Sequence, residues 1–190
     1  MSNMSKLKEV VARIQLIAPT ISGEPLAGAR YSPEASASPT QCFSNAQRKA
    51  KQSGGGVLYG WMFQYREATA LPGQGYVLAV NHAVWHAPDK KLIDVTPFHD
   101  NPHHHPIVVN ADAVLFLIGS TATPLRNDHA GLALPSWFFP LTEDEAIAAY
   151  VADLTAKELT EREAQVTAID GLKASTRATE LFRARRGAII

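Results

Sequence analysis

The spacing of apolar residues divides the chain into a helical beginning, a strand-like middle and a helical end. Over residues 6–17, apolar side chains recur every three or four positions, which predicts an amphipathic helix. Pro19 is expected to end this helix, because proline cannot donate a backbone hydrogen bond. Residues 20–37 are rich in Pro, Gly, Ser and Ala, and therefore predict an irregular connector.

A second helix is predicted from the residues that precede its apolar positions. Ser38 is its expected N-cap, Pro39 its first helical residue, and Gln41 the capping-box partner of Ser38. The helix would continue to Ala50 and end at the glycines of residues 54–56.

The middle of the chain predicts an antiparallel sheet. Turn sequences at residues 71–75 and 87–90 separate apolar segments into hairpins. The predicted strands are Val57–Tyr65, Tyr76–Trp85, Leu92–Thr96, Ile107–Val109 and Val114–Ile118.

Helical spacing returns near the C-terminus. Thr142 and Glu145 form a capping box, and residues 147–154 have one apolar face. A weaker helix is expected over residues 164–184, interrupted near Gly171. The bulky Trp-Phe-Phe sequence at residues 137–139 is expected to pack in the core or at a helix entry.

These elements predict one domain over residues 1–190. Its parts are an N-terminal helix (1–19), the connector (20–37), a helix-plus-sheet core (38–140) and C-terminal helices (141–190). With 46% hydrophobic residues, a chain of 190 residues can bury a substantial core.

Charge and cysteine content narrow the possible functions. The formal net charge is +0, so the basic excess of a nucleic-acid-binding protein is absent. One cysteine, Cys42, allows no intramolecular disulfide. The first 19 residues lack the apolar block of a signal peptide, and no apolar run reaches about 20 residues, the length that spans a bilayer. We therefore expect a cytoplasmic protein that binds neither nucleic acid nor membrane.

Three residues combine into a candidate catalytic set. Cys42 is expected in the first turn of its helix, where unpaired N–H groups and the helix dipole favour a thiolate. His82 and Asp94 are polar residues inside apolar strands, and burying them is costly without partners. A small buried thiol and a structural His–Asp pair are the alternative interpretations.

The predicted hairpin brings the histidine and the aspartate together. His82 and Asp94 lie six residues either side of Pro88, so a hairpin centred there would place them directly opposite each other on one face. Asp94 could then orient the imidazole and stabilise its charged form. A one-residue change of register would separate them.

The order of these residues resembles the papain-like cysteine superfamily. His82-Ala83-Val84-Trp85 followed by Asp94-Val95-Thr96-Pro97 is similar to the transglutaminase-like branch, although Val84 and Val95 depart from its pattern. The resemblance covers Gln41 to Pro97 only. It implies an α+β fold in which a nucleophile helix packs on an antiparallel sheet, with flanking N- and C-terminal helices.

By this resemblance the protein is a thiol-dependent hydrolase or acyltransferase that acts on a peptide, an amide or another acyl group. Cys42 would attack, His82 would take and return the proton, and Asp94 would orient His82. The Cys42 backbone N–H is the natural first oxyanion donor. Further oxyanion or substrate-binding candidates are Gln41, Asn45, Asn81 and Trp85. A non-catalytic binding protein with the same fold is the alternative.

A histidine-rich segment follows the predicted catalytic strands. It contains His99, Asp100, His103, His104 and His105. Of these, His99, His103 and His105 are weak candidates for a metal site, which is a third possible function. A solvated loop between prolines is favoured over a dedicated site, and the segment could instead line the mouth of the Cys42 site. We expect no cofactor.

The expected partner is a peptide, protein or small acyl substrate. The terminal helices offer a possible surface for a homo-oligomer.

Overall fold

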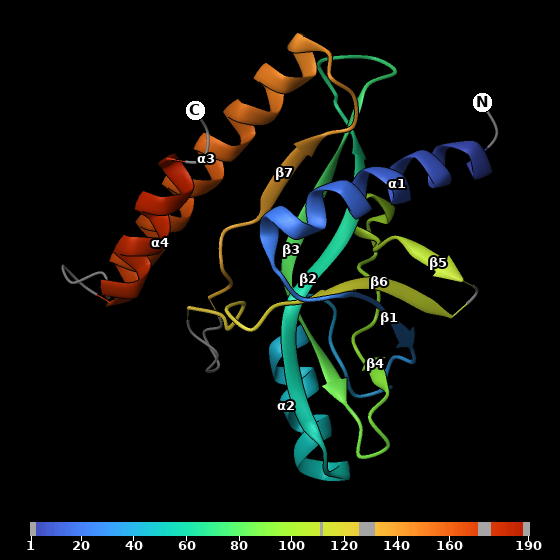
Figure 1. Ribbon diagram of the computed structural model, residues 1–190. Helices are drawn as coiled ribbons and strands as arrows, with labels where there is room; N and C mark the ends of the chain where they lie inside the picture. Colours follow the sequence, from blue (N-terminus) through green and yellow to red (C-terminus); the bar gives the residue numbers. More distant parts are fainter. Residues whose placement is uncertain (1–2, 111, 126–131, 171–175, 188–190) are drawn as a thin grey trace.

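The computed structural model describes residues 3–110, 112–125, 132–170 and 176–187, and Figure 1 shows their arrangement. The helices are α1 (Asn3–Ile21), α2 (Cys42–Ser53), α3 (Glu145–Asp170) and α4 (Thr176–Gly187), with a 3-10 turn, η1 (Pro102–His104). The strands are β1 (Leu26–Tyr31), β2 (Gly56–Glu67), β3 (Gly75–His86), β4 (Leu92–Asp94), β5 (Val108–Asn110), β6 (Ala113–Ile118) and β7 (Trp137–Pro140).

Five of these strands close into a mixed barrel. The order around it is β1-β4-β3-β2-β6, and β6 returns to pair with β1. All neighbours are antiparallel except β1 and β4, which run parallel. β5 extends the sheet beyond β6, and β7 pairs with the first half of β3. The two longest strands, β2 and β3, form a hairpin in the middle of this strand order (Figure 1).

The closed barrel shows that the expected papain-type fold is wrong. The predicted strands β2 and β3 are confirmed nearly to the residue, but they belong to a closed mixed sheet rather than to an antiparallel sheet with a helix on it. Closure depends on β1, which lies inside the segment predicted as an irregular connector. The pairing of β1 with β4 and β6 spans more than 60 residues, so local spacing did not reveal it.

Apolar side chains from the barrel strands meet in the interior. The cluster includes Ala29 of β1, Val84 of β3 and Phe116 of β6, each fully buried. Leu58 of β2 and Leu92 of β4 pack against them. Because side chains alternate along a strand, His82 and Asp94 share these interior-facing sides of β3 and β4.

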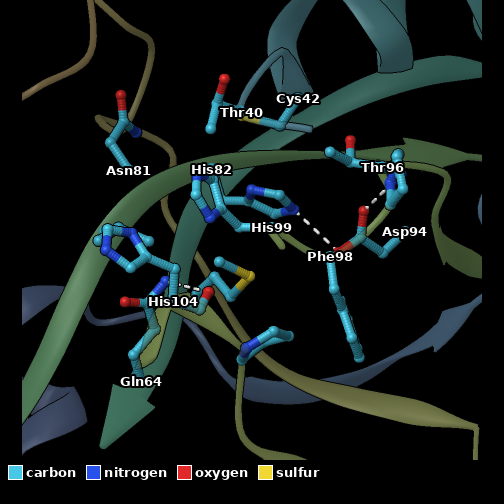
Figure 2. A pocket seen from close by; sticks show the side chains of 14 residues that line it. Thr40, Cys42, Gln64, Asn81, His82, Asp94, Thr96, Phe98, His99 and His104 are labelled. Carbon is cyan, nitrogen blue, oxygen red and sulfur yellow. Dashed lines mark hydrogen bonds and ion pairs between the residues drawn. The ribbon is translucent and has the colours of Figure 1, made fainter. Parts of the chain in front are cut away.

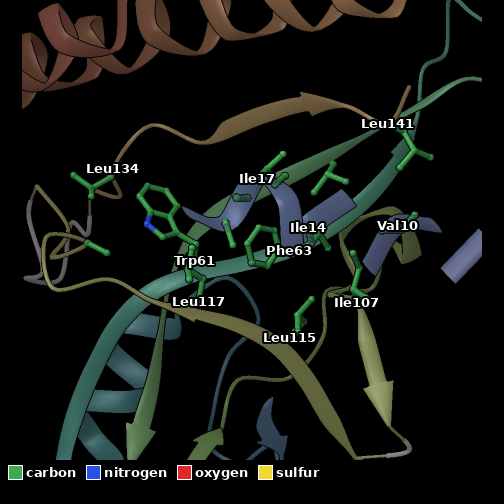
Figure 3. Packing of buried hydrophobic residues seen from close by; sticks show 14 residues of the cluster. Val10, Ile14, Ile17, Trp61, Phe63, Ile107, Leu115, Leu117, Leu134 and Leu141 are labelled. Atoms are coloured by element: carbon green, nitrogen blue, oxygen red, sulfur yellow. The ribbon is translucent and has the colours of Figure 1, made fainter. Parts of the chain in front are cut away.

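Helix α1 covers the outer face of the sheet. Val10, Ile14 and Ile17 are buried against Phe63 and Leu117, as Figure 3 shows. Burying each aliphatic side chain contributes about 1.5–3 kcal/mol. This packing explains why α1 continues through Pro19, the residue expected to end it, to Ile21. A proline in the last turn removes only one helical hydrogen bond.

The C-terminal helices pack against β7, a strand that the sequence did not indicate. Trp137 and Phe139 of β7 contact the α1 cluster, whereas Phe138 contacts Tyr76 and the α3 side. Four bulky residues in a row show no alternation, which is why only core packing was expected there. The expected interruption near Gly171 lies outside the described residues.

Arg185 attaches α4 to β7. Its guanidinium stacks on Trp137, with 3.1 Å from Cζ to the ring centroid, and donates to the carbonyls of Pro135 and Ser136. Burial lowers the pKa of Arg185 to about 9, although the negative charge of Glu158 opposes this shift.

Among the described helices, none is long and apolar enough to cross a bilayer.

Candidate active site

Cys42 is the first residue of α2. Gln41 is the N-cap, with φ −102° and ψ 38°, and its side chain makes no capping hydrogen bond. The predicted capping box and helix start at Ser38 are therefore wrong, although the thiol still lies in the first turn. Here the backbone N–H groups have no acceptor within the helix. The Cys42 side chain is buried, with 7% of its surface exposed.

The residue two positions before Cys42 has an unusual backbone. Thr40 has φ 64°, in the left-handed region that β-branched residues rarely adopt. Such a conformation persists only where surrounding contacts hold it, and it is common at functional sites. Thr40 is exposed and lines the cavity in front of Cys42.

The structure brings His82 and Asp94 into direct contact. Nε2 of His82 lies 3.0 Å from Oδ2 of Asp94, and both side chains are buried. The second oxygen of Asp94, Oδ1, accepts the backbone N–H of Thr96 at 3.0 Å. Both carboxylate oxygens therefore have a partner, which fixes the direction in which Asp94 presents its charge.

The hairpin that joins them is centred one residue later than predicted. Ala87 pairs with Lys91 around a three-residue loop in which Lys90 has φ 66°. Trp85 is consequently opposite Ile93, so Asp94 is diagonal to His82 and not opposite it. A register shift of two residues keeps both side chains on the same face, and a diagonal pair is still within reach of a long side chain.

Cys42 completes the set from the other side of the imidazole. Burial disfavours the charged ring and is the largest single effect on it. Even so, the charges of Asp94 and Cys42 and their hydrogen bonds raise the pKa of His82 well above its usual value. Since Nε2 faces Asp94, the nitrogen left for the Cys42 thiol is Nδ1. Figure 2 shows Cys42 at the helix end near His82, with Asp94 on the far side.

Gly60 and Phe116 hold the imidazole from the barrel interior. Gly60 is paired with His82 across the β2–β3 ladder, and an added Cβ there would lie 2.1 Å from the Leu117 carbonyl oxygen and 2.5 Å from the Phe116 ring. The absent side chain leaves room for Phe116, whose ring lies edge-on to the His82 ring with 6.4 Å between the two ring centroids.

Asn45 connects α2 to the segment that follows β4. Its amide nitrogen donates to the Ser38 carbonyl at 2.8 Å and to Oγ1 of Thr96 at 3.2 Å. Its amide oxygen accepts from the Ser38 N–H and from Arg48. Asn45 is 1% exposed, so this connection is shielded from water. The hydrogen bonds therefore link α2, Thr96 and Asp94 in one buried network.

The structure places the other sequence-predicted oxyanion and substrate residues in four different settings. Asn45 is used as just described. Asn81 lines the same cavity as Cys42, although it lies on the opposite face of β3 from His82. Its amide nitrogen donates to the carbonyls of Gly60 and Ala122, and its amide oxygen accepts the N–H of Leu134. The Trp85 indole donates to Gly54 and lines a different surface groove. Gln41 is exposed beside Cys42. The Cys42 backbone N–H remains the best-placed donor.

The Cys42 thiol opens into a cavity of about 210 Å³. Beside the three candidate catalytic residues, its walls come from β2, β3 and residues 96–106. Several of these residues were not singled out from the sequence: Thr40, Met62, Gln64, Val80, Thr96, Phe98 and Pro106. Alternation along β2 and β3 was the available signal for Met62, Gln64 and Val80, because they share the face of Gly60 and His82.

The histidine-rich segment lines this cavity through His99 and His104. Their rings stack at 4.8 Å, and Nδ1 of His99 accepts the N–H of Asn101 at 2.9 Å. Gln64 anchors the segment by donating to the His104 carbonyl at 2.9 Å. Burial and the nearby charges of Arg66, His99 and His103 lower the pKa of His104. Within the described residues, no three histidine, cysteine or acidic side chains are grouped as metal ligands.

Searches against protein-family models, curated proteins and solved structures found no match to this chain.

Proposed function

We propose that the protein is a thiol-dependent hydrolase or acyltransferase that uses Cys42 as the nucleophile. The observation that carries the proposal is the continuous contact from Cys42 through His82 to Asp94 at a cavity wall. A nucleophile beside a base that a third group orients is the usual arrangement for covalent acyl transfer. The proposal does not depend on a papain-type fold.

The chemistry follows from the positions of these groups. With the thiol proton on His82, the Cys42 sulfur attacks the substrate carbonyl carbon and forms a C–S bond. The carbonyl oxygen takes the electron pair and accepts a hydrogen bond from the Cys42 N–H. His82 then protonates the leaving nitrogen or oxygen as its bond to carbon breaks, which gives a thioester. Water or an amine attacks this thioester, and His82 takes its proton and returns it to sulfur.

Asp94 orients His82 through this cycle and stabilises its charged form. The raised pKa of His82 favours the imidazolium form in the free protein. Both ring N–H groups then donate, one to Asp94 and one to Cys42. The similarity of residues 41–97 to the transglutaminase-like branch supports the same roles as a hypothesis about local chemistry. As part of the same proposal, the protein is cytoplasmic and its acyl substrate is uncharged.

Acyl-enzyme formation tests the proposed function. The protein is mixed with p-nitrophenyl acetate, and intact-protein mass spectrometry follows the added acetyl group. We expect one acetyl group per chain at Cys42, formed at least tenfold more slowly in His82→Ala. Cys42→Ser serves as the control for acetylation elsewhere. Equal labelling of the parent and Cys42→Ser would show that the site is not a thiol acyl-transfer site and would favour a binding protein.

A further inference from the structure

The cavity continues from Cys42 along the interior face of the β2–β3 hairpin. Met62 and Val80 pair directly across the two strands, one rung beyond the Gly60–His82 pair on the same face. Two residues along a strand span about 6.6 Å. The Met62–Val80 pair therefore lies beside the acyl chain of a substrate whose carbonyl carbon is at Cys42. Both side chains line the cavity.

Gln64 closes the far end of this space. It is 4% exposed, and its carboxamide is already paired with the His104 carbonyl and with Arg66. Figure 2 shows Gln64 and His104 at the end of the cavity opposite Cys42. A group that enters from the thiol therefore meets two apolar side chains and then a fixed polar wall.

The charges around the cavity restrict what can be bound. Apart from Cys42, His82 and Asp94, the described lining residues carry no lysine, arginine or acidic side chain. Burial and nearby positive charge lower the pKa of His104, one of the two other lining histidines, which favours its neutral form. A charged group on the acyl chain would lose its water without gaining a counter-ion, which is strongly unfavourable.

The volume sets a limit on size. About 210 Å³ lies below the roughly 300–1,000 Å³ typical of sites for drug-sized ligands. We propose that the site accepts a short, uncharged aliphatic acyl group, and that Met62 and Val80, in front of the Gln64 wall, set how long a chain can enter. This inference rests on the proposed thiol acyl transfer and names its substrate class.

A series of p-nitrophenyl esters tests this specificity. The acyl groups are acetyl, butanoyl, hexanoyl, decanoyl and the negatively charged succinyl group, whose carbon chain has the length of butanoyl. In each reaction the Cys42 sulfur forms a thioester and p-nitrophenolate leaves, so the mass of the protein reports this step. Nitrophenolate release is corrected by the same reaction without protein, because the succinyl carboxylate can expel nitrophenolate from its own ester. We expect butanoyl or hexanoyl to react fastest, with decanoyl and succinyl at least tenfold slower.

Matched variants locate the source of the selectivity. Val80→Ala and Met62→Ala should raise the rate with decanoyl relative to butanoyl at least fivefold. Val77→Ala is the control, because Val77 is the same residue type on the same strand but is buried on the α1 side. It should leave the ratio unchanged. Thermal unfolding of each variant identifies any that fail to fold.

The outcomes separate this inference from the proposed function. Acylation of Cys42 at similar rates by all five esters, or equal rates with butanoyl and succinyl, overturns the substrate class and leaves thiol acyl transfer standing. The parent series alone decides this if the variants do not fold. No acylation by any ester overturns both proposals.

Discussion

Two histidines that line the same cavity, His82 and His104, differ in their surroundings and in the direction of their pKa shifts. His82 is buried between a carboxylate and a thiol, and its pKa is raised. His104 is half-buried beside His99, His103 and Arg66, and its pKa is lowered. Partners of opposite charge stabilise the proton on His82, whereas burial and then the charges of its neighbours disfavour the proton on His104. The same side chain is thus suited to proton transfer in one place and to neutral lining in the other.

Replacing His82 is expected to have the largest effect, which is on the reactivity of Cys42. His82→Ala should slow the alkylation of Cys42 by iodoacetamide at pH 7 at least tenfold, because the sulfur loses the group that accepts its proton. His86→Ala is the matched control, since His86 is on the same strand and does not line the cavity. Equal alkylation rates in the parent and His82→Ala would contradict the activation of Cys42.

Removing the negative charge behind His82 should have a smaller effect. Asp94→Asn is expected to slow alkylation severalfold, because the amide no longer favours the charged imidazole. Thermal unfolding of the same variant is the second measurement. An unchanged alkylation rate with a clearly lowered melting temperature would assign Asp94 to the scaffold alone.

Breaking the hydrogen bonds between α2 and Thr96 is expected to lower the unfolding free energy more clearly than the reactivity of Cys42. Asn45→Ala removes the donor to the buried Thr96 hydroxyl and one hydrogen bond to the Ser38 carbonyl, which costs about 1–3 kcal/mol of unfolding free energy. Urea unfolding measures this loss, and Ser44→Ala, on a half-buried neighbour in the same helix, is the control. A loss no larger than that of the control would show that the link contributes little.

The smallest expected effects are the contributions of His82 and His104 to the unfolding free energy, which depend on pH in opposite directions. His82 has a raised pKa in the folded protein, so its contribution to stability is complete below about pH 6.5 and is lost as pH rises through the folded pKa. His104 has a lowered pKa, so its contribution is present above about pH 6.5 and is lost as pH falls through the folded pKa.

Unfolding free energies between pH 5 and 9 measure both contributions. The difference between the parent and His82→Gln should shrink as pH rises, and the difference between the parent and His104→Gln should shrink as pH falls. Slopes of the same sign for the two variants would contradict the contrast between these histidines.

Local pattern was sufficient for the elements that bear the candidate site. Apolar segments and the turn residues between them predicted β2 and β3. The hairpin predicted the approach of His82 and Asp94, and the family resemblance added Cys42. The hairpin register was wrong by two residues, because it depends on Lys90 adopting a positive φ in a three-residue loop. The side chains still meet because an even shift preserves the face.

By itself, the sequence determined the parts of the protein in which neighbouring residues decide the conformation: helix faces, strand alternation and the position of the thiol in a first helical turn. Tertiary structure decided the closure of the barrel through β1, the partners of Asn45, and the charge preferences of His82 and His104. These depend on groups that are distant in sequence, and a pKa or a strand pairing is set by whatever lies within a few ångströms in space. The identity of those neighbours appears only once the chain has folded.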